Sequence, residues 1–183
     1  MERVNYGEYK LTKYFNDILF ETLEEPMRRL GFPIQEREHE IKRKEFDLWF
    51  HNKRDKIIVI IECEIKGWTA YTNIKKLEET GIIKNPNLRI ILFQVFSPLF
   101  QKDKQRIDLV KHCKSLAKSF QKKYRKFKYY ILNISIDYNF FDKMLNSFQR
   151  NKSYAKQKYG PILKRESDYL AKRIVEMCQN AIS

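Results

Sequence analysis

Apolar residues recur along the chain with two different periods, and the alternation between these periods predicts alternating helices and strands. A spacing of three to four predicts a first helix over residues 8–31, with a kink or restart at Pro26 and an end at Gly31. Further helical patterns cover 102–126 and 138–148, and a shorter helix opens at Thr69 or Thr72 and ends at Gly81. The polar segment 149–159 predicts a loop or frayed turn, and Gly160-Pro161 begins the last helix.

Strand-like runs occupy the intervals between these helices. Their ranges are 33–41, 45–50, 57–61, 88–96 and 128–136. The run from Ile57 to Ile61 is continuously apolar and mostly β-branched, which is typical of a strand buried on both faces. The charged run 33–41 suits an exposed edge, and the turn-like segment 51–55 predicts a hairpin between its two neighbours.

The order of these elements predicts the fold class. A helix precedes three strands, and then helices and strands alternate up to a helical C-terminal part. Strand–helix–strand units favour parallel pairing, whereas the hairpin adds antiparallel pairing. We therefore expect an α/β fold with a mixed central β-sheet flanked by helices. At 183 residues, without a linker or an internal repeat, the chain fits a single domain over 1–183.

Acidic residues stand where the most buried strand ends. Glu62, Glu64 and Lys66 alternate with Cys63 and Ile65, so the three charges point to one side of the strand. Asp47 interrupts the apolar run one hairpin upstream, and the two strands can bring these groups together. The alternative is a strand end whose charges are simply solvated.

This combination of groups suits phosphodiester hydrolysis. Asp47, Glu62 and Glu64 offer hard oxygen ligands for Mg²⁺, which polarises a phosphoryl oxygen and lowers the pKa of an attacking water. Lys66 could stabilise the developing negative charge, and Glu64 could instead act as the general base.

Charge narrows the class of partner. The net charge is +14 and the isoelectric point is near 9.6, which favours a polyanion such as nucleic acid. Candidate phosphate contacts lie on one face of the predicted helix 102–126: Lys104, Lys111, Lys118, Lys122 and Arg125. The segment 150–165 is a second basic candidate, and for both surfaces the alternative is a solvated helix face.

The remaining composition indicates a cytoplasmic protein. Cys63, Cys113 and Cys178 lie far apart in apolar patterns, so we expect three buried free thiols in a reducing compartment. No apolar run approaches membrane length, and the first residues contain no hydrophobic signal-peptide segment. These observations predict no membrane partner.

The pattern resembles the PD-(D/E)xK nuclease superfamily, whose restriction-endonuclease-like core has the order helix, three strands, helix, strand. Residues of about 8–135 are similar to that core, and about 137–183 form a C-terminal helical extension. Asp47 can pair with Glu64-Ile65-Lys66, or with Glu62-Cys63-Glu64 and a lysine supplied by Lys66, Lys75 or Lys76. Glu45-Phe46 precedes Asp47, so the proline of the family pattern is absent.

The resemblance implies an Mg²⁺-dependent endodeoxyribonuclease, with Mn²⁺ as an alternative metal. Some members of such folds use an extra acid from the first helix, for which Glu8 and Glu21 are the candidates. The resemblance also implies DNA as the partner, with RNA left open, and a possible homodimer. Two other readings stay open: a catalytically inactive nucleic-acid-binding protein on the same fold, and a basic protein-interaction module.

Overall fold

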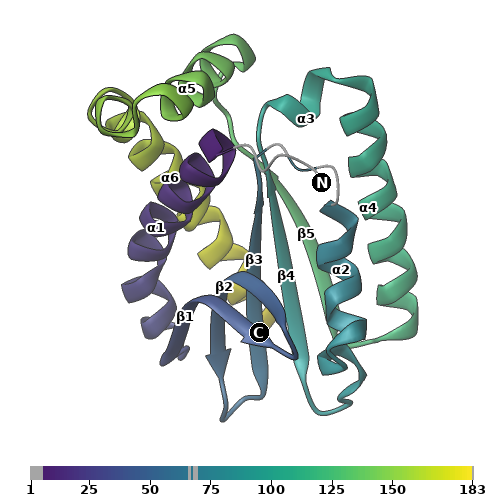
Figure 1. Ribbon diagram of the computed structural model, residues 1–183. Helices are drawn as coiled ribbons and strands as arrows, with labels where there is room; N and C mark the ends of the chain where they lie inside the picture. Colours follow the sequence, from purple (N-terminus) through teal and green to yellow (C-terminus); the bar gives the residue numbers. More distant parts are fainter. Residues whose placement is uncertain (1–5, 66, 68–69, 183) are drawn as a thin grey trace.

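One five-stranded mixed sheet organises the computed structural model, which describes residues 6–65, 67 and 70–182 (Figure 1). Its strands lie side by side in chain order: β1 (Ile34–Ile41), β2 (Lys44–Asn52), β3 (Ile57–Glu64), β4 (Arg89–Phe96) and β5 (Phe127–Asn133). The first three pair antiparallel through hairpins, whereas β3, β4 and β5 run parallel. The predicted class, an α/β fold with a mixed sheet, is confirmed.

Helices cover both faces of this sheet (Figure 1). One face packs against α1 (Tyr6–Arg29), α5 (Tyr138–Arg150) and α6 (Lys152–Ile182). The other packs against α2 (Ala70–Glu79) and α4 (Lys104–Lys123), with the short α3 (Leu99–Lys102) and the 3₁₀ turn η1 (Ile82–Lys84) as connectors. Residues of β3 alternate between the two cores, so every residue of this strand is buried and its unbroken apolar run is explained.

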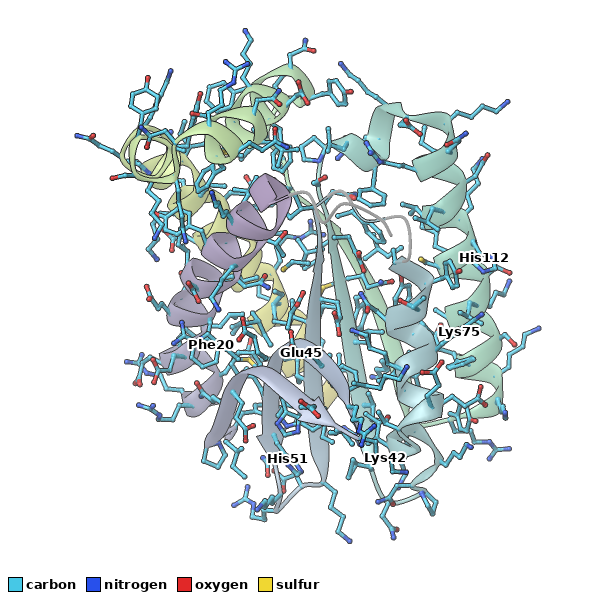
Figure 2. All side chains as sticks on the ribbon, in the orientation of Figure 1. Phe20, Lys42, Glu45, His51, Lys75 and His112 are labelled. Carbon is cyan, nitrogen blue, oxygen red and sulfur yellow. The ribbon has the colours of Figure 1, made fainter. Side chains whose placement is uncertain are left out.

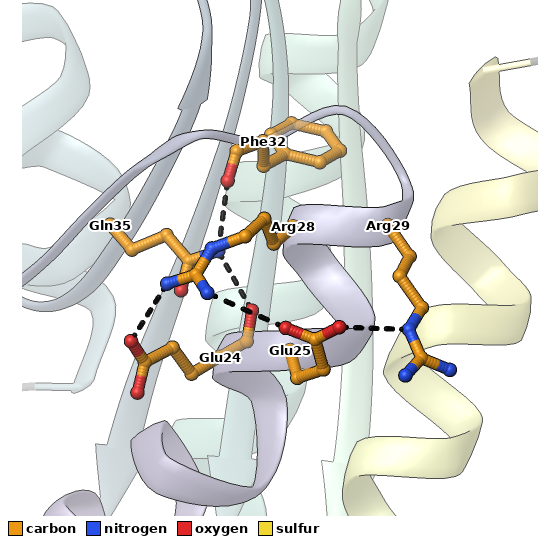
Figure 3. A network of polar contacts seen from close by, with 6 residues as sticks. All are labelled: Glu24, Glu25, Arg28, Arg29, Phe32 and Gln35. Atoms are coloured by element: carbon orange, nitrogen blue, oxygen red, sulfur yellow. Dashed lines mark hydrogen bonds and ion pairs between the residues drawn. The ribbon is translucent and has the colours of Figure 1, made fainter.

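The first helix passes through Pro26 without interruption, so the restart expected there is wrong. Arg28 pairs with Glu24 at 3.0 Å and Arg29 with Glu25 at 2.9 Å, and both pairs link residues on either side of the proline (Figure 3). Gly31 then ends the helix as predicted. Its φ of +89° allows the Phe32 N–H to donate to the Met27 carbonyl at 3.0 Å.

Two further helix boundaries differ from the sequence expectation. The helix expected over 102–126 is α4 at Lys104–Lys123, and it is separate from α3, which ends at Lys102, because Asp103 caps α4 by accepting from the Arg106 N–H at 3.1 Å. The loop expected over 149–159 is mostly helical, because α6 starts at Lys152 after the Asn151 side chain accepts from the Tyr154 N–H at 3.1 Å. Gly160 is a packing residue in that helix, since a Cβ there would lie 2.9 Å from the Tyr14 hydroxyl oxygen on α1.

The three cysteines are buried and free, as predicted. In the part of the chain that the structure describes, no helix combines the length and apolar character needed to cross a bilayer.

Gly31 provides a test of the α1 end. Gly31→Ala should destabilise the fold by about 1–2 kcal/mol, because alanine is strained at positive φ. Gly31→Asn should lose clearly less stability, because asparagine tolerates the left-handed region. Both substitutions introduce the same Cβ, which would lie 3.1 Å from Asn52 Nδ2. Thermal melts of both variants check this, and equal melting temperatures would contradict the backbone explanation.

Candidate functional site

The candidate site lies at the end of β3, where Glu62 and Glu64 are 2% and 7% exposed. Both side chains reach the α2 side of the sheet, since each contacts a residue of that helix. The carboxyl ends of the parallel strands β3, β4 and β5 meet at this edge of the sheet, a usual location for sites in open α/β sheets.

Asp47 reaches this cluster because the regular alternation of β2 breaks at its position. Leu48 packs in the α1-side core, whereas Phe46, two residues away, packs in the α2-side core. The partner strand is distorted at the same level, where Glu38 has a φ of +54°. Pairing between β2 and β3 ends at Leu48 and Ile61. Asp47 Oδ2 then accepts from the Cys63 N–H at 2.8 Å, which places its carboxylate beside the segment that carries both glutamates.

A lysine of α2 completes the cluster. Lys76 Nζ lies 3.4 Å from Glu62 Oε1 and donates to the Glu45 carbonyl at 2.7 Å. Lys75 instead lies over the ring of Tyr71, which contacts His112 of α4. Lys75 and His112 both lie on the side of the molecule formed by α2 and α4 (Figure 2). Of the two lysines considered on α2, Lys76 therefore belongs to the site. Lys66, the lysine predicted first, lies outside the described residues.

Amide groups hold Glu64 from two sides. Asn73 Nδ2 and Gln94 Nε2 donate to Glu64 Oε1 at 2.5 and 3.0 Å. Gln94 also donates to the Ala70 carbonyl at 2.8 Å and accepts from the Tyr129 hydroxyl at 2.6 Å. Because these contacts use both ends of its amide, Gln94 is fixed as a positioning residue for Glu64. In the sequence Gln94 is the polar residue that interrupts the apolar run 90–96, whereas nothing in the sequence marks Asn73 or Tyr129 as site residues.

Burial and mutual repulsion dominate the electrostatics of the three carboxyl groups. Burial is the largest cause that raises the pKa of Asp47, and it raises the pKa of Glu62 well above its usual range, with the Asp47 charge next. The same two causes raise the pKa of Glu64 to about 7. Lys76 lowers the pKa of all three. When fully ionised, these four groups carry −3 + 1 = −2, a charge that one divalent cation would balance.

The donor set fits a hard cation by its chemistry. Carboxylate oxygens are the ligands that Mg²⁺ prefers, and Asn16 of α1 adds an amide hydrogen-bonded to Asp47. The Asn16 Oδ1 atom is buried and has no hydrogen-bond partner within the described chain. The described part of the chain contains no group of three or more His, Cys, Asp or Glu side chains already arranged as a metal site. Each carboxylate is engaged by a protein donor instead.

The predicted phosphate contacts lie elsewhere. All five are exposed on α4 or just beyond its end: Lys104, Lys111, Lys118, Lys122 and Arg125. Lys111 pairs with Asp108 at 2.7 Å. Within the described residues none of the five bonds to the acidic cluster. Of the acids considered on the first helix, Glu21 is exposed, and the side chain of Glu8 is outside the described part.

The fold and the site together define an α/β protein with a buried acidic cluster at the carboxyl edge of a mixed sheet. Searches against protein-family models and curated proteins found no match. A functional proposal for this chain therefore has to be argued from the geometry of this cluster.

The raised pKa of Glu64 predicts a specific pH dependence of stability. The folded protein retains this proton up to about pH 7, whereas an ordinary glutamate loses it near 4.5, so ionisation of Glu64 lowers stability progressively across that window. Glu64→Gln keeps the acceptor oxygen for Asn73 and Gln94 and removes the charge. In metal-free buffer its stability relative to wild type should rise between pH 4.5 and 7 and then level off.

Chemical denaturation at several pH values measures this difference. Glu79→Gln is the matched control, because Glu79 is an exposed α2 residue paired with Lys44 at 2.7 Å. A difference between Glu64→Gln and wild type that does not change with pH would contradict the assignment.

Proposed function

We propose that the chain is a metal-dependent endonuclease that hydrolyses DNA phosphodiester bonds. The observation that carries this proposal is the buried meeting of Asp47, Glu62 and Glu64 with a single lysine of α2. Such a cluster of like charges opposes folding, and strongly perturbed carboxyl groups gather preferentially at functional sites. The order α1, β1–β3, α2, β4 is also that of the restriction-endonuclease-like core, with α1 and α2 on opposite faces of the sheet.

The acidic residues would hold Mg²⁺, with Mn²⁺ as an alternative. When bound, the ion would polarise a phosphoryl oxygen and lower the pKa of a coordinated water. The Cys63 N–H orients Asp47, and the amides of Asn73 and Gln94 orient Glu64. Lys76 would stabilise negative charge that develops on the phosphate, because its ammonium already lies within the cluster.

The arrangement favours one of the two ways in which the nuclease motif can be matched to this sequence. Glu62 and Glu64 contact the same helix, and Asp47 bonds the residue between them. This supports Asp47 with Glu62-Cys63-Glu64 and a lysine from the following helix, Lys76. In the other register the lysine is Lys66, which lies outside the described residues.

A second candidate is a catalytically inactive nucleic-acid-binding protein on the same fold. The favouring observation is that protein donors already occupy all three carboxylates: Cys63 on Asp47, Lys76 on Glu62, and two amides on Glu64. The cleavage experiment below separates the two candidates. The homodimer implied by the resemblance stays a prediction.

Supercoiled plasmid nicking tests the nuclease directly. The wild type should nick plasmid in Mg²⁺ or Mn²⁺ and stop in EDTA. Asp47→Asn combined with Glu64→Gln should lower the rate by about 10³-fold or more, because both changes remove charged metal ligands while keeping hydrogen-bonding shape. Glu79→Gln should retain wild-type nicking.

The wild type should also be assayed on single-stranded and branched DNA. If it binds these substrates but cuts none of them with either metal, the inactive binding protein becomes the correct description.

The lysine assignment has its own matched pair of variants. Lys76→Met should lower cleavage by about 10²–10³-fold, because a charge-stabilising group would be lost from the site. Lys75→Met, one residue away, should stay within a few-fold of wild type. Single-turnover rates on one labelled duplex measure both variants, and equal losses would reject Lys76 as the charge-stabilising residue.

A further inference from the structure

A basic groove lies between α5 and the first turns of α6. It has a volume of about 520 Å³, and its charged lining consists of Lys143, Arg150 and Lys158. Asn146, Asn151 and Tyr154 supply its polar and aromatic surface. We refer to these six residues as the α5–α6 groove.

The charge of this region is one-sided. From residue 143 to residue 165 the chain has seven lysine and arginine residues and no aspartate or glutamate. Within the described residues the three cations of the groove form no ion pair, whereas Lys111 on α4 pairs with Asp108. Such a surface attracts an anion whose charges repeat along its length, as phosphates do.

Tyr154 adds a surface on which a flat ring can stack. It is 50% exposed, among the largest exposures of an aromatic side chain in the described chain, and Lys158 Nζ lies 5.5 Å from its ring centre. An exposed aromatic ring beside cations that form no ion pair within the described residues is typical of surfaces that bind single-stranded nucleic acid, where a base stacks and phosphates lie alongside.

The groove is at the end of the sheet that carries the acidic cluster. Helix α5 begins five residues after β5 ends, and both α5 and the start of α6 lie at the end where β3, β4 and β5 finish (Figure 1). The basic residues of α4 instead extend along that helix toward the opposite end. The groove and the cluster therefore lie at the same end of the sheet, with the groove on the face covered by α5 and α6 and the cluster on the face covered by α2.

We propose that the α5–α6 groove binds single-stranded nucleic acid, with Arg150 and Lys158 on phosphates and Tyr154 stacked on a base. The choice of nucleic acid as partner rests on the proposed function, but binding in the groove requires neither metal nor catalysis. The groove belongs to the C-terminal helices, outside the part of the chain that resembles the nuclease core.

Fluorescence polarisation with a labelled 20-nucleotide DNA strand in EDTA tests the groove without cleavage. Arg150→Gln/Lys158→Gln should reduce the slope of log affinity against log salt by about 1.4, because two phosphate contacts on a single strand are lost. Tyr154→Ala should weaken single-strand binding by about tenfold, while Tyr154→Phe retains it and duplex binding changes less.

The charge-matched control is Lys53→Gln/Lys84→Gln, two exposed lysines at the opposite end of the sheet, which should leave the slope unchanged. Equal effects of the groove and control variants would overturn the proposal, as would wild-type binding by the groove variants. Preferential binding of an acidic peptide over DNA would overturn it in favour of a protein partner.

The outcome is separable from that of the proposed function. Groove-dependent binding without plasmid nicking keeps this proposal and rejects the nuclease. Plasmid nicking by the wild type, together with groove variants that bind DNA like wild type, keeps the nuclease and rejects this proposal.

Discussion

The burial of two glutamates at the end of the central strand is the constraint on which the rest of the site depends. A charge removed from water costs several kcal/mol even after relaxation, whereas a hydrogen bond to a charged group returns about 1.5–3 kcal/mol. Glu64 receives two amide donors, and Glu62 receives one ammonium. These donors come from α2 and β4, so the carboxyl groups are held only when both elements pack on β3. The contacts offset the cost of burial without a clear surplus, which points to a role other than stability.

The sequence was sufficient to predict the sheet because burial determines the spacing of apolar residues along each strand. The strands β3 and β4 are largely apolar, and the start of β3 and both ends of β4 were located to within about one residue. The hairpin also brought Asp47 to the glutamates in the prediction, since adjacent strands must meet. Helix α6 was misjudged because polar residues 149–159 hide two buried contacts, Ala155 and Tyr159, and because the capping role of Asn151 went unrecognised. The pair Gly160-Pro161 predicts a helix start, whereas both residues lie inside α6 and the glycine allows close packing on α1.

Other parts of the site could not be predicted from one sequence, because they depend on three-dimensional offsets. The break in alternation at Asp47 comes from a distortion shared with β1 and leaves no mark in residue type. The choice between Lys75 and Lys76 depends on the rotation of α2, which its apolar spacing fixes only to within a fraction of a turn. Asn73 and Tyr129 are unremarkable on their own elements. They become site residues only through Glu64 and Gln94, which connect three elements.

The positive net charge of the protein and its acidic cluster have opposite effects on an approaching phosphate. A protein of net charge +14 attracts a polyanion from a distance, yet the cluster at the carboxyl edge is negative when its carboxyl groups are ionised and would then repel a phosphate at close range. Protonation can remove part of that charge, since the pKa of Glu64 lies at about 7. A divalent cation removes the same charge and supplies a positive centre as well, and it competes with the proton for the same oxygens. The two solutions make opposite demands on pH, because a proton neutralises the cluster in acid whereas a cation requires the ionised carboxylates. On this basis, activity that requires added divalent cation and also rises as Glu64 ionises identifies the cation as the group that lets phosphate approach.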